Sequence, residues 1–166
     1  MSGAYYTIAV VGCGAAKQDK PAPAGEMYTS VLFRLSYEYA QAVGDDVVIA
    51  SAKHGLLALD DVIEPYERRL VAAQALEWAA GFCAALWFRF QTACRADPNV
   101  TGLRVVLLAG RAYTDPLGAM MRYGEQRFIA DEGIGVPPYT IEEPLRGMQI
   151  GQRLRWLRRQ LDARVN

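Results

Sequence analysis

The stretch YYTIAVVGC, residues 5–13, is a nearly unbroken run of apolar and β-favouring residues. A strand with one solvated face alternates polar and apolar residues, whereas a strand buried on both faces of a parallel sheet does not. Two further runs of this kind follow, VVIASA at residues 47–52 and LRVVLLAG at residues 103–110. We therefore expect three buried parallel strands, joined by the helical crossovers that parallel pairing requires.

The segment after the first of these runs is typical of a loop followed by a helix. A stretch rich in Gly, Ala and Pro extends to about residue 27. Thr29 or Ser30 can cap the next helix, whose apolar residues recur at helical spacing until Gly44 ends it. Residues 53–70 are rich in turn-forming residues and are expected to form a structured loop.

Strands that alternate with helices along a chain of 166 residues predict one α/β domain. The remaining helices are expected over residues 72–97, from Thr114 or Asp115 with Pro116 in the first turn, and over about residues 148–163. The expected fold is a single small α/β domain over residues 1–166, with a mainly parallel three- to five-stranded sheet flanked by helices. Its C-terminal helix is rich in Arg.

The composition limits the classes of protein to which the chain can belong. Hydrophobic residues make up 52% and charged residues 22%, which is typical of a globular domain with a real core. The formal net charge is zero, so any nucleic-acid surface has to be a local patch. The N-terminus has no signal-peptide pattern, and no apolar run approaches the roughly 20 residues that span a bilayer. We therefore expect a cytoplasmic protein with no membrane partner.

Three cysteines and one histidine offer little for metal binding or disulfide formation. Cys13, Cys83 and Cys94 are an odd number and form no C-x-x-C pair, and His54 is the only other soft ligand. We therefore expect a reduced protein with no metal ion and no other cofactor. Cys83 and Cys94 lie on the apolar long helix and are expected in the core.

Polar and cationic residues follow each expected strand at the point where it ends. Because the carboxyl ends of parallel strands meet at the edge where α/β proteins bind ligands, these residues should lie close together. They are Gly12, Cys13, Gly14, Lys17, Ser51, Lys53, His54 and Arg111. Three potential cations beside backbone N–H groups predict a site for an anion such as a phosphate or a carboxylate. The alternative is that these Lys and Arg side chains simply meet water where the loops begin.

The loop GCGAAK, residues 12–17, matches neither of the common phosphate-binding motifs. It lacks the third glycine of the dinucleotide fingerprint and the G-K-[ST] of a P-loop, which argues against a dinucleotide or Walker-type ATP site. Lys17 is then the ligand contact and Cys13 the wall of the pocket. Alternatively, Lys17 lowers the pKa of the Cys13 thiol and makes it a nucleophile. His54 is either a general acid–base group or an ordinary surface residue.

The segment DDVIEPYERRL, residues 60–70, supplies a tyrosine and several carboxylates near the same edge. Tyr66 and Glu67 are candidate site residues, with Glu67 as a second candidate for proton transfer. Asp61 and Glu64 are expected to cap and solubilise the loop instead.

The C-terminal helix is expected to be amphipathic. One stripe carries the apolar side chains and the other side carries the basic ones, namely Ile150, Leu154, Leu157 and Leu161 against Arg155, Arg158 and Arg159. With Trp156 stacked on a base, the three arginines form a candidate nucleic-acid-binding face. The alternative is a surface helix whose basic face is only solvated.

The order of short motifs resembles an uncharacterised family of small bacterial and phage proteins. The motifs are GCGAAK, MYTSVLF, SAKHGLLALDDVIEPYERRL and LAGRAY, and the family carries C-x-x-x-K, L-Y-T-S-x-L-F, S-A-K-[YH]-G-L-L and I-x-P-Y in this order. The third motif is also distantly similar to a stretch of the peroxide-stress protein YaaA family, whose members bind DNA. The spacing of Cys13, Lys17, Tyr28 and Ser30 resembles the P-C-S-x-x-K-P-Y-S motif of archaeosine synthase, which modifies a deazaguanine base in tRNA. These resemblances imply a shared site location and a link to nucleic-acid bases or nucleotides.

Two functions follow from these observations, and both stay open at this point. The first is an enzyme that acts on a nucleobase, a nucleotide or a modified nucleic acid, by base modification or N-glycosidic-bond chemistry. Lys17 and Lys53 would hold phosphate, His54 or Glu67 would transfer protons, and Tyr28 and Tyr66 would stack on or bond to the base. The second is a non-catalytic DNA-binding stress-response module that uses the Arg-rich helix, and a small-molecule anion sensor is a weaker third. The substrate and the oligomeric state are not predicted.

Overall fold

The innermost strand of the sheet is β1 (Ala4–Gly12), the first of the three apolar runs. In the computed structural model, which describes residues 4–131 and 137–165, its residues Ile8 to Val11 have no exposed surface. β1 pairs in parallel with β3 (Asp46–Ser51) on one side and with β6 (Val100–Leu108) on the other. The burial of both faces agrees with the lack of polar alternation in this strand.

Two shorter strands complete the sheet, whose order is β4-β3-β1-β6-β7. β7 (Tyr139–Glu142) is parallel to β6, and β4 (Gly55–Leu57) turns back from β3 as an antiparallel edge strand. The turn needs Gly55, because its φ of 72° is costly for residues with a side chain. The prediction of a mainly parallel sheet of three to five strands, flanked by helices, is confirmed.

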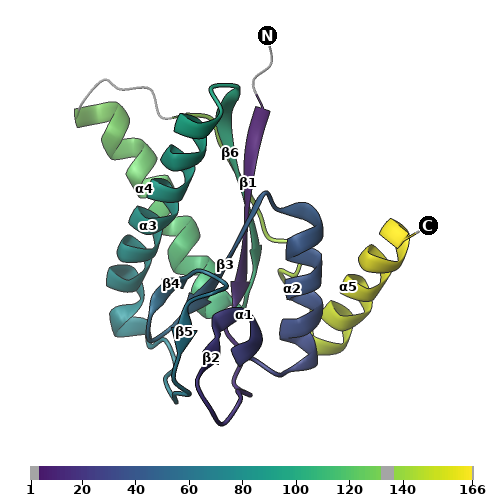
Figure 1. Ribbon diagram of the computed structural model, residues 1–166. Helices are drawn as coiled ribbons and strands as arrows, with labels where there is room; N and C mark the ends of the chain where they lie inside the picture. The colour runs from purple at the N-terminus through teal and green to yellow at the C-terminus, as the bar shows by residue number, and fades with distance from the viewer. Residues whose placement is uncertain (1–3, 132–136, 166) are drawn as a thin grey trace.

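Helices cover both faces of the sheet, so the α/β domain has three layers (Figure 1). α2 (Val31–Val43) and α5 (Ile150–Val165) pack on one face, and α3 (Ala75–Ala96) and α4 (Arg111–Asp131) pack on the other. Each face buries an apolar cluster, in which every fully buried Leu, Ile or Phe side chain contributes about 1.5–3 kcal/mol. Within the described ranges, none of these helices combines the length and the apolar character needed to cross a membrane.

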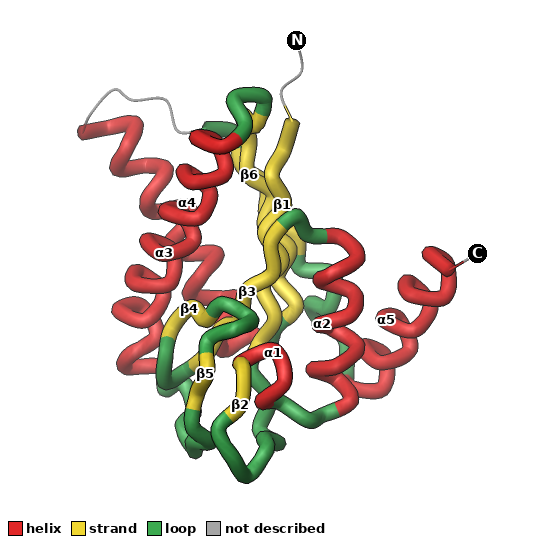
Figure 2. The backbone as a smooth tube through the Cα atoms, viewed as in Figure 1, coloured by secondary structure: helices red, strands yellow, loops and turns green. Residues whose placement is uncertain are grey.

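Short elements gather at the carboxyl ends of the strands (Figure 2). They are β2 (Ala22–Pro23), α1 (Ala24–Met27), β5 (Val62–Ile63) and the 3-10 helix η1 (Ala72–Gln74). β2 and β5 pair in antiparallel fashion. This pairing brings the loop that follows β1 against the loop that follows β4.

The structure corrects the sequence-based boundaries where elements are short. The region expected as a loop over residues 53–70 contains β4 and β5, and the loop expected up to residue 27 contains β2 and α1. β7 was not expected. Strands of two to four residues are too short to show a hydrophobic pattern in the sequence. They form because they pair with segments that are distant in the chain.

The boundaries of the longer elements hold more closely. Ser30 caps α2, with its hydroxyl accepting a hydrogen bond from the Phe33 N–H, and Gly44 ends this helix as expected. α4, however, begins at Arg111 rather than at Thr114 or Asp115, so Pro116 lies inside the helix. The Gly110 carbonyl accepts hydrogen bonds from Tyr113 and Thr114, which starts the helix one turn earlier than the proline pattern predicts.

β1 and β6 are neighbours, yet the helices that follow them lie on opposite faces of the sheet. α2 follows β1 on one face, and α4 follows β6 on the other. Outside the carboxyl ends of two such strands a crevice opens, and α/β proteins bind ligands at this topological switch point. α2 and α4 both begin at this edge, and so does α5 (Figure 1).

Candidate functional site

Three hydroxyl groups form a hydrogen-bonded chain at the carboxyl edge of the sheet. Tyr66 Oη lies 2.7 Å from Ser51 Oγ and 2.8 Å from Tyr28 Oη. The backbone N–H groups of Lys53 and His54 both donate to Ser51 Oγ, at 3.3 and 3.1 Å. Because these amides occupy its two lone pairs, the Ser51 hydroxyl donates to Tyr66, and Tyr66 in turn donates to Tyr28.

Burial keeps both tyrosines of this chain neutral. Tyr28 has no exposed surface and Tyr66 is only 7% exposed. Removal from water raises the pKa of both hydroxyls, because the phenolate loses more solvation than the phenol. The two rings are therefore closed to stacking with a base, whereas a bond from Tyr28 or Tyr66 to a base stays a prediction. The Tyr66 ring instead packs against the side chains of Lys17, Lys53 and His54.

Lys17, Lys53 and His54 gather around the ring of Tyr66, and we call these four residues the Tyr66 cluster. Lys17 Nζ lies 4.5 Å from the centre of the ring and Lys53 Nζ lies 5.6 Å from it. The His54 imidazole meets the same ring edge-on, with the ring centres 5.2 Å apart. Cation–π attraction thus helps to hold two ammonium groups from two different loops on one side chain.

Backbone pairing sets the position of Lys17. The Gln18 N–H donates to the Met27 carbonyl at 2.8 Å, and the Thr29 N–H donates to the Ala16 carbonyl at 3.0 Å. Lys17 and Tyr28 therefore form an isolated antiparallel bridge. The loop after β1 folds back on the start of α2, and this return places Lys17 beside the buried tyrosines.

His54 is suited to accept a proton at neutral pH. Partial burial, followed by the nearby Lys53 ammonium, lowers the pKa of its imidazole below the usual value. The ring is therefore neutral around pH 7, which is the form that acts as a general base.

Cys13 has a tyrosine as its partner. Its Sγ lies 3.1 Å from Tyr113 Oη, on the first turn of α4. Burial, and then the contact with Cys13, raises the pKa of the Tyr113 hydroxyl. The Lys17 ammonium donates to the Ala15 carbonyl at 3.3 Å. This arrangement agrees with Cys13 as a wall of the site, while its activation as a nucleophile stays a prediction.

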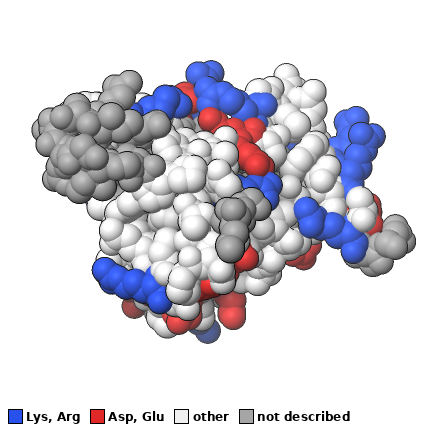
Figure 3. Space-filling model, turned by 90° about the horizontal axis from the view of Figure 1, so that it is seen from above, with Lys and Arg blue, Asp and Glu red and all other residues white. Residues whose placement is uncertain are grey.

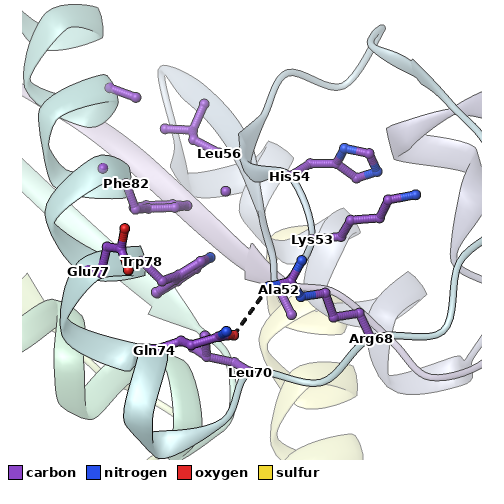
Figure 4. Close-up of a pocket in the computed structure, with 13 residues that line it drawn as sticks. Ala52, Lys53, His54, Leu56, Arg68, Leu70, Gln74, Glu77, Trp78 and Phe82 are labelled. Atoms are coloured by element: carbon purple, nitrogen blue, oxygen red, sulfur yellow. Dashed lines mark hydrogen bonds between the residues drawn. The ribbon is translucent and has the colours of Figure 1, made fainter.

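A groove of about 510 Å³, which we call the β4–α3 groove, runs beside the Tyr66 cluster. Its side chains include Leu56, Arg68, Gln74, Glu77, Trp78 and Phe82. The Trp78 indole N–H donates to the Ser51 carbonyl at 2.8 Å, which fixes the ring. In Figure 4 the Lys53 and His54 side chains point away from Trp78, on the other side of the loop that they share with the groove. Lys53 and His54 nevertheless belong to the residues that line the groove, so the groove borders the cluster and shares these two residues with it.

A second, smaller cavity of about 80 Å³ lies at the topological switch point, and we call it the switch-point cavity. The residues that line it include four of the predicted site residues, namely Gly12, Cys13, Gly14 and Ser30. Tyr113 also lines it. The sequence therefore predicted one site, whereas the structure distributes the predicted residues between this cavity and the Tyr66 cluster.

Glu67 and Arg111 lie outside both groups. Glu67 is exposed and is not among the residues that line either cavity. The Arg111 guanidinium pairs with Asp115 at 3.2 Å, and the same carboxylate also pairs with Arg146 at 3.1 Å. Arg111 is therefore bound in a surface ion-pair network and adds no cation to the Tyr66 cluster.

The C-terminal helix exposes its arginines, whereas its tryptophan is half-buried. Arg155, Arg158 and Arg159 are exposed, whereas Trp156 packs edge-on against Tyr39 with the ring centres 5.1 Å apart. Trp156 is half-buried, and stacking of a base on it stays a prediction. Ile150 is 61% exposed, so the apolar stripe is also shorter than predicted. The view from the opposite edge of the sheet shows Lys and Arg side chains in separate groups around the rim, among the residues described there (Figure 3).

Several residues of the two cavities were not predicted from the sequence. They are Arg68, Gln74, Glu77 and Trp78 in the groove, and Ser36, Tyr113 and Arg153 in the switch-point cavity. Only Tyr113 carried a usable signal, since it ends the LAGRAY motif directly after a buried strand. In the part of the chain that the structure describes, no group of three or more His, Cys, Asp or Glu side chains is placed to hold a metal ion.

Comparison with known proteins gives one match. A model described as a family of unknown function (DUF6884) matches residues 8–159, as the order of motifs predicts for an uncharacterised family. No curated protein and no solved structure matched the chain.

Proposed function

The chain belongs to the DUF6884 family, a family of unknown function, and we propose that it is an enzyme acting on a nucleobase, a nucleotide or a modified nucleic acid. The chemistry we propose is base modification or cleavage of an N-glycosidic bond. The observation that carries this proposal is the convergence of Lys17, Lys53 and His54 on the ring of Tyr66. These residues meet at the carboxyl edge of the sheet, where α/β proteins bind their substrates.

The groups of the Tyr66 cluster have complementary roles in such a reaction. The Lys17 and Lys53 ammonium groups would hold a phosphate or stabilise negative charge that develops on a departing base. His54, neutral at pH 7, would accept the proton of a water molecule as its oxygen bonds to the sugar carbon. The bond between that carbon and the base nitrogen breaks in the same step, and the base leaves with the electron pair.

The β4–α3 groove offers a place for a further part of a larger substrate. Its volume of about 510 Å³ falls within the range of small-molecule sites. Trp78 is half-buried, so part of its ring remains open for stacking. A nucleic-acid strand that crosses residues 52–55 would contact the Tyr66 cluster with one nucleotide and the groove with the next.

The motif resemblances support a nucleic-acid base as the substrate class. Lys17 and Tyr28 belong to the spacing that resembles archaeosine synthase, and Lys53, His54 and Tyr66 belong to the stretch that is similar to the YaaA family. Lys17, Tyr28, Lys53 and His54 lie together around Tyr66, whereas Cys13 and Ser30 line the switch-point cavity.

The test begins with a search for turnover. The purified protein is incubated with nucleosides, nucleoside monophosphates, and short single- and double-stranded DNA and RNA. Released or altered bases are then detected by chromatography with mass spectrometry. We expect one class to turn over, and we expect Lys17→Gln and His54→Gln to lose at least 100-fold in rate, as removal of general acid–base or electrostatic groups does.

Lys20→Gln is the matched control, since Lys20 is an exposed lysine of the same loop and should keep the full rate. The proposal fails if no substrate class is altered. It also fails if Lys20→Gln lowers the rate as much as Lys17→Gln does, because the loss of rate would then come from the change in net charge and not from the position of Lys17.

The exposure of Arg155, Arg158 and Arg159 favours a second candidate, a non-catalytic DNA-binding module. Such a module would bind a labelled DNA duplex with an affinity that falls steeply with salt. Fluorescence anisotropy with the triple Arg→Gln variant tests it: weaker binding and a shallower salt dependence support the module, and unchanged binding excludes it. Under this candidate, Lys17→Gln leaves the affinity nearly unchanged.

A further inference from the structure

We propose that the switch-point cavity binds a phosphate group or a similar tetrahedral oxyanion. The cavity is lined by the ends of β1 and β6, by the first turns of α2, and by Tyr113, Leu145 and Arg153. The proposal stands independently of the function proposed for the Tyr66 cluster, because it uses different side chains.

Ser36 carries an unsatisfied hydroxyl into this cavity. The residue is only 2% exposed, it lines the cavity, and its Oγ has no hydrogen-bond partner in the described part of the chain. Buried hydroxyl groups in folded proteins nearly always have a partner, and leaving one unpaired is costly. A bound oxyanion would accept the hydrogen bond that this hydroxyl can donate.

The first turn of α2 supplies an unpaired backbone N–H group at the cavity. The Phe33 N–H donates to Ser30 Oγ and the Arg34 N–H donates to the Ser30 carbonyl. The N–H groups of Val31 and Leu32 are thus left without a backbone acceptor among the described residues, and of these two residues Leu32 lines the cavity. The positive end of the helix dipole adds to them, as it does at other phosphate sites.

α4 presents a second helix N-terminus to the cavity. Gly110, which directly precedes the first residue of α4, lines the cavity, and so does Tyr113 of the first turn. α2 and α4 lie on opposite faces of the sheet, so their positive ends approach the cavity from two sides. This arrangement favours an anion over a neutral ligand.

Arg153 supplies the full positive charge. Its Nε donates to the Met148 carbonyl at 2.9 Å, which orients the guanidinium. Of the described carboxylates, none forms an ion pair with it, so its two terminal nitrogens keep their donors for a ligand. An oriented guanidinium suits the oxygens of a phosphate because it can donate two parallel hydrogen bonds.

The size of the cavity limits the group that it can hold. A volume of about 80 Å³ equals the share of about two or three water molecules in the liquid. A phosphate group fits this space, whereas a nucleobase does not. The phosphate can belong to free inorganic phosphate or to a phosphate ester whose remaining atoms extend out of the cavity.

The experiment measures the binding of inorganic phosphate and of ribose 5-phosphate by titration calorimetry, at an ionic strength held constant with sodium chloride. Arg153→Gln should raise the dissociation constant about tenfold or more, as expected for a lost charge-assisted hydrogen bond. Ser36→Ala should raise it about threefold or more, as expected for a lost neutral hydrogen bond. Equal affinities for the two probes identify free phosphate as the ligand, and tighter binding of the ester identifies a phosphate monoester.

Arg164→Gln is the matched control, because it removes the same charge from an exposed position near the far end of the same helix and should leave both affinities unchanged. Ser36→Ala should melt at the same temperature as the natural protein or higher, so its loss of binding cannot be ascribed to unfolding. Arg153→Lys, which keeps the charge without the planar fork, should bind with intermediate affinity. The proposal is overturned if the natural protein binds neither probe saturably, or if Arg164→Gln weakens binding as much as Arg153→Gln does.

Discussion

The Lys17 ammonium lies 4.5 Å from the centre of the Tyr66 ring, and the hydroxyl of that ring is hydrogen-bonded on both sides, to Ser51 and to Tyr28. Tyr66 therefore cannot move without breaking buried hydrogen bonds. The position of a flexible surface cation is thus set from inside the protein. Substitutions in the hydroxyl chain should affect both stability and the Tyr66 cluster.

Tyr66→Phe should lower the free energy of unfolding by about 1–3 kcal/mol. The substitution keeps the ring but removes the hydroxyl that links Ser51 to Tyr28, which leaves a buried donor and a buried acceptor without partners. Urea unfolding at pH 7 measures the change. Tyr5→Phe, at a tyrosine that is 46% exposed, should cost less than about 0.5 kcal/mol. Equal losses in the two variants would show that the hydroxyl chain contributes nothing.

Arg89→Gln should destabilise the protein more than Arg104→Gln. Arg89 donates two hydrogen bonds to Asp46, at 2.6 and 2.8 Å, and joins α3 to β3 with side-chain exposures of 33% and 16%. We expect a loss of about 1–3 kcal/mol, below the value for a fully buried pair because water partly screens this one. Arg104 and Glu142 form a similar pair that is more exposed, and its loss should cost about 0–1 kcal/mol.

Chemical unfolding of Arg89→Gln, Asp46→Asn and the double variant isolates the coupling energy of the first pair. We expect the double variant to lose less than the sum of the single losses, since the partner left alone in each single variant is unpaired. Strict additivity would mean that Arg89 stabilises the fold by packing alone.

His54 should titrate below its usual pKa of about 6.5. It is the only histidine of the chain, so its imidazole signals in an NMR titration are unambiguous. Lys53→Gln should raise the midpoint, because the Lys53 ammonium lowers the pKa, and Asp61→Asn should lower it further, because the Asp61 carboxylate raises the pKa. A midpoint at or above 6.5 in the natural protein would contradict this prediction.

The same shift predicts how His54 contributes to stability at acid pH. Below about pH 6.5 the unfolded chain takes up the proton first, since its imidazole has the higher pKa. Stability therefore falls as the pH decreases from about 6.5 to the folded pKa, and His54 adds no further loss below that. His54→Gln should be less sensitive to pH in this window, which thermal melts across the range measure directly. If His54→Gln loses as much stability at acid pH as the natural protein does, His54 is not the source of this loss.

Gly12→Ala should destabilise the protein by about 1–3 kcal/mol, whereas Gly110→Ala should be nearly neutral. A Cβ at Gly12 would lie 2.8 Å from the Cβ of Ala109, where Gly12 ends β1 and Ala109 directly follows β6, the neighbour of β1 in the sheet. A Cβ at Gly110 meets nothing within 4 Å. Thermal denaturation of the two variants tests the difference, and similar melting temperatures would contradict it.

Residues 5–13, together with the similar runs at residues 47–52 and 103–110, determined the fold class, because strands without polar alternation are typical of burial on both faces of a parallel sheet. Ser30 and Gly44 likewise marked the ends of α2, since capping depends on neighbouring backbone groups. The carboxyl edge of the sheet was also predictable as the place where Lys17, Lys53 and His54 gather, because parallel strands bring their ends to one side.

Only the tertiary structure decided which polar residues lie together and at which site each cationic side chain lies. Ser36, Tyr113 and Arg153 come from three helices, and no periodicity relates them, so their meeting at the switch-point cavity depends on the packing of α2, α4 and α5. Burial also changed the role of Tyr28 and Tyr66 from exposed stacking rings to a hydrogen-bonded support. The physical reason is range: apolar runs and helix caps can be recognised from residues close in sequence, whereas cavities arise where segments distant in the chain leave space between them.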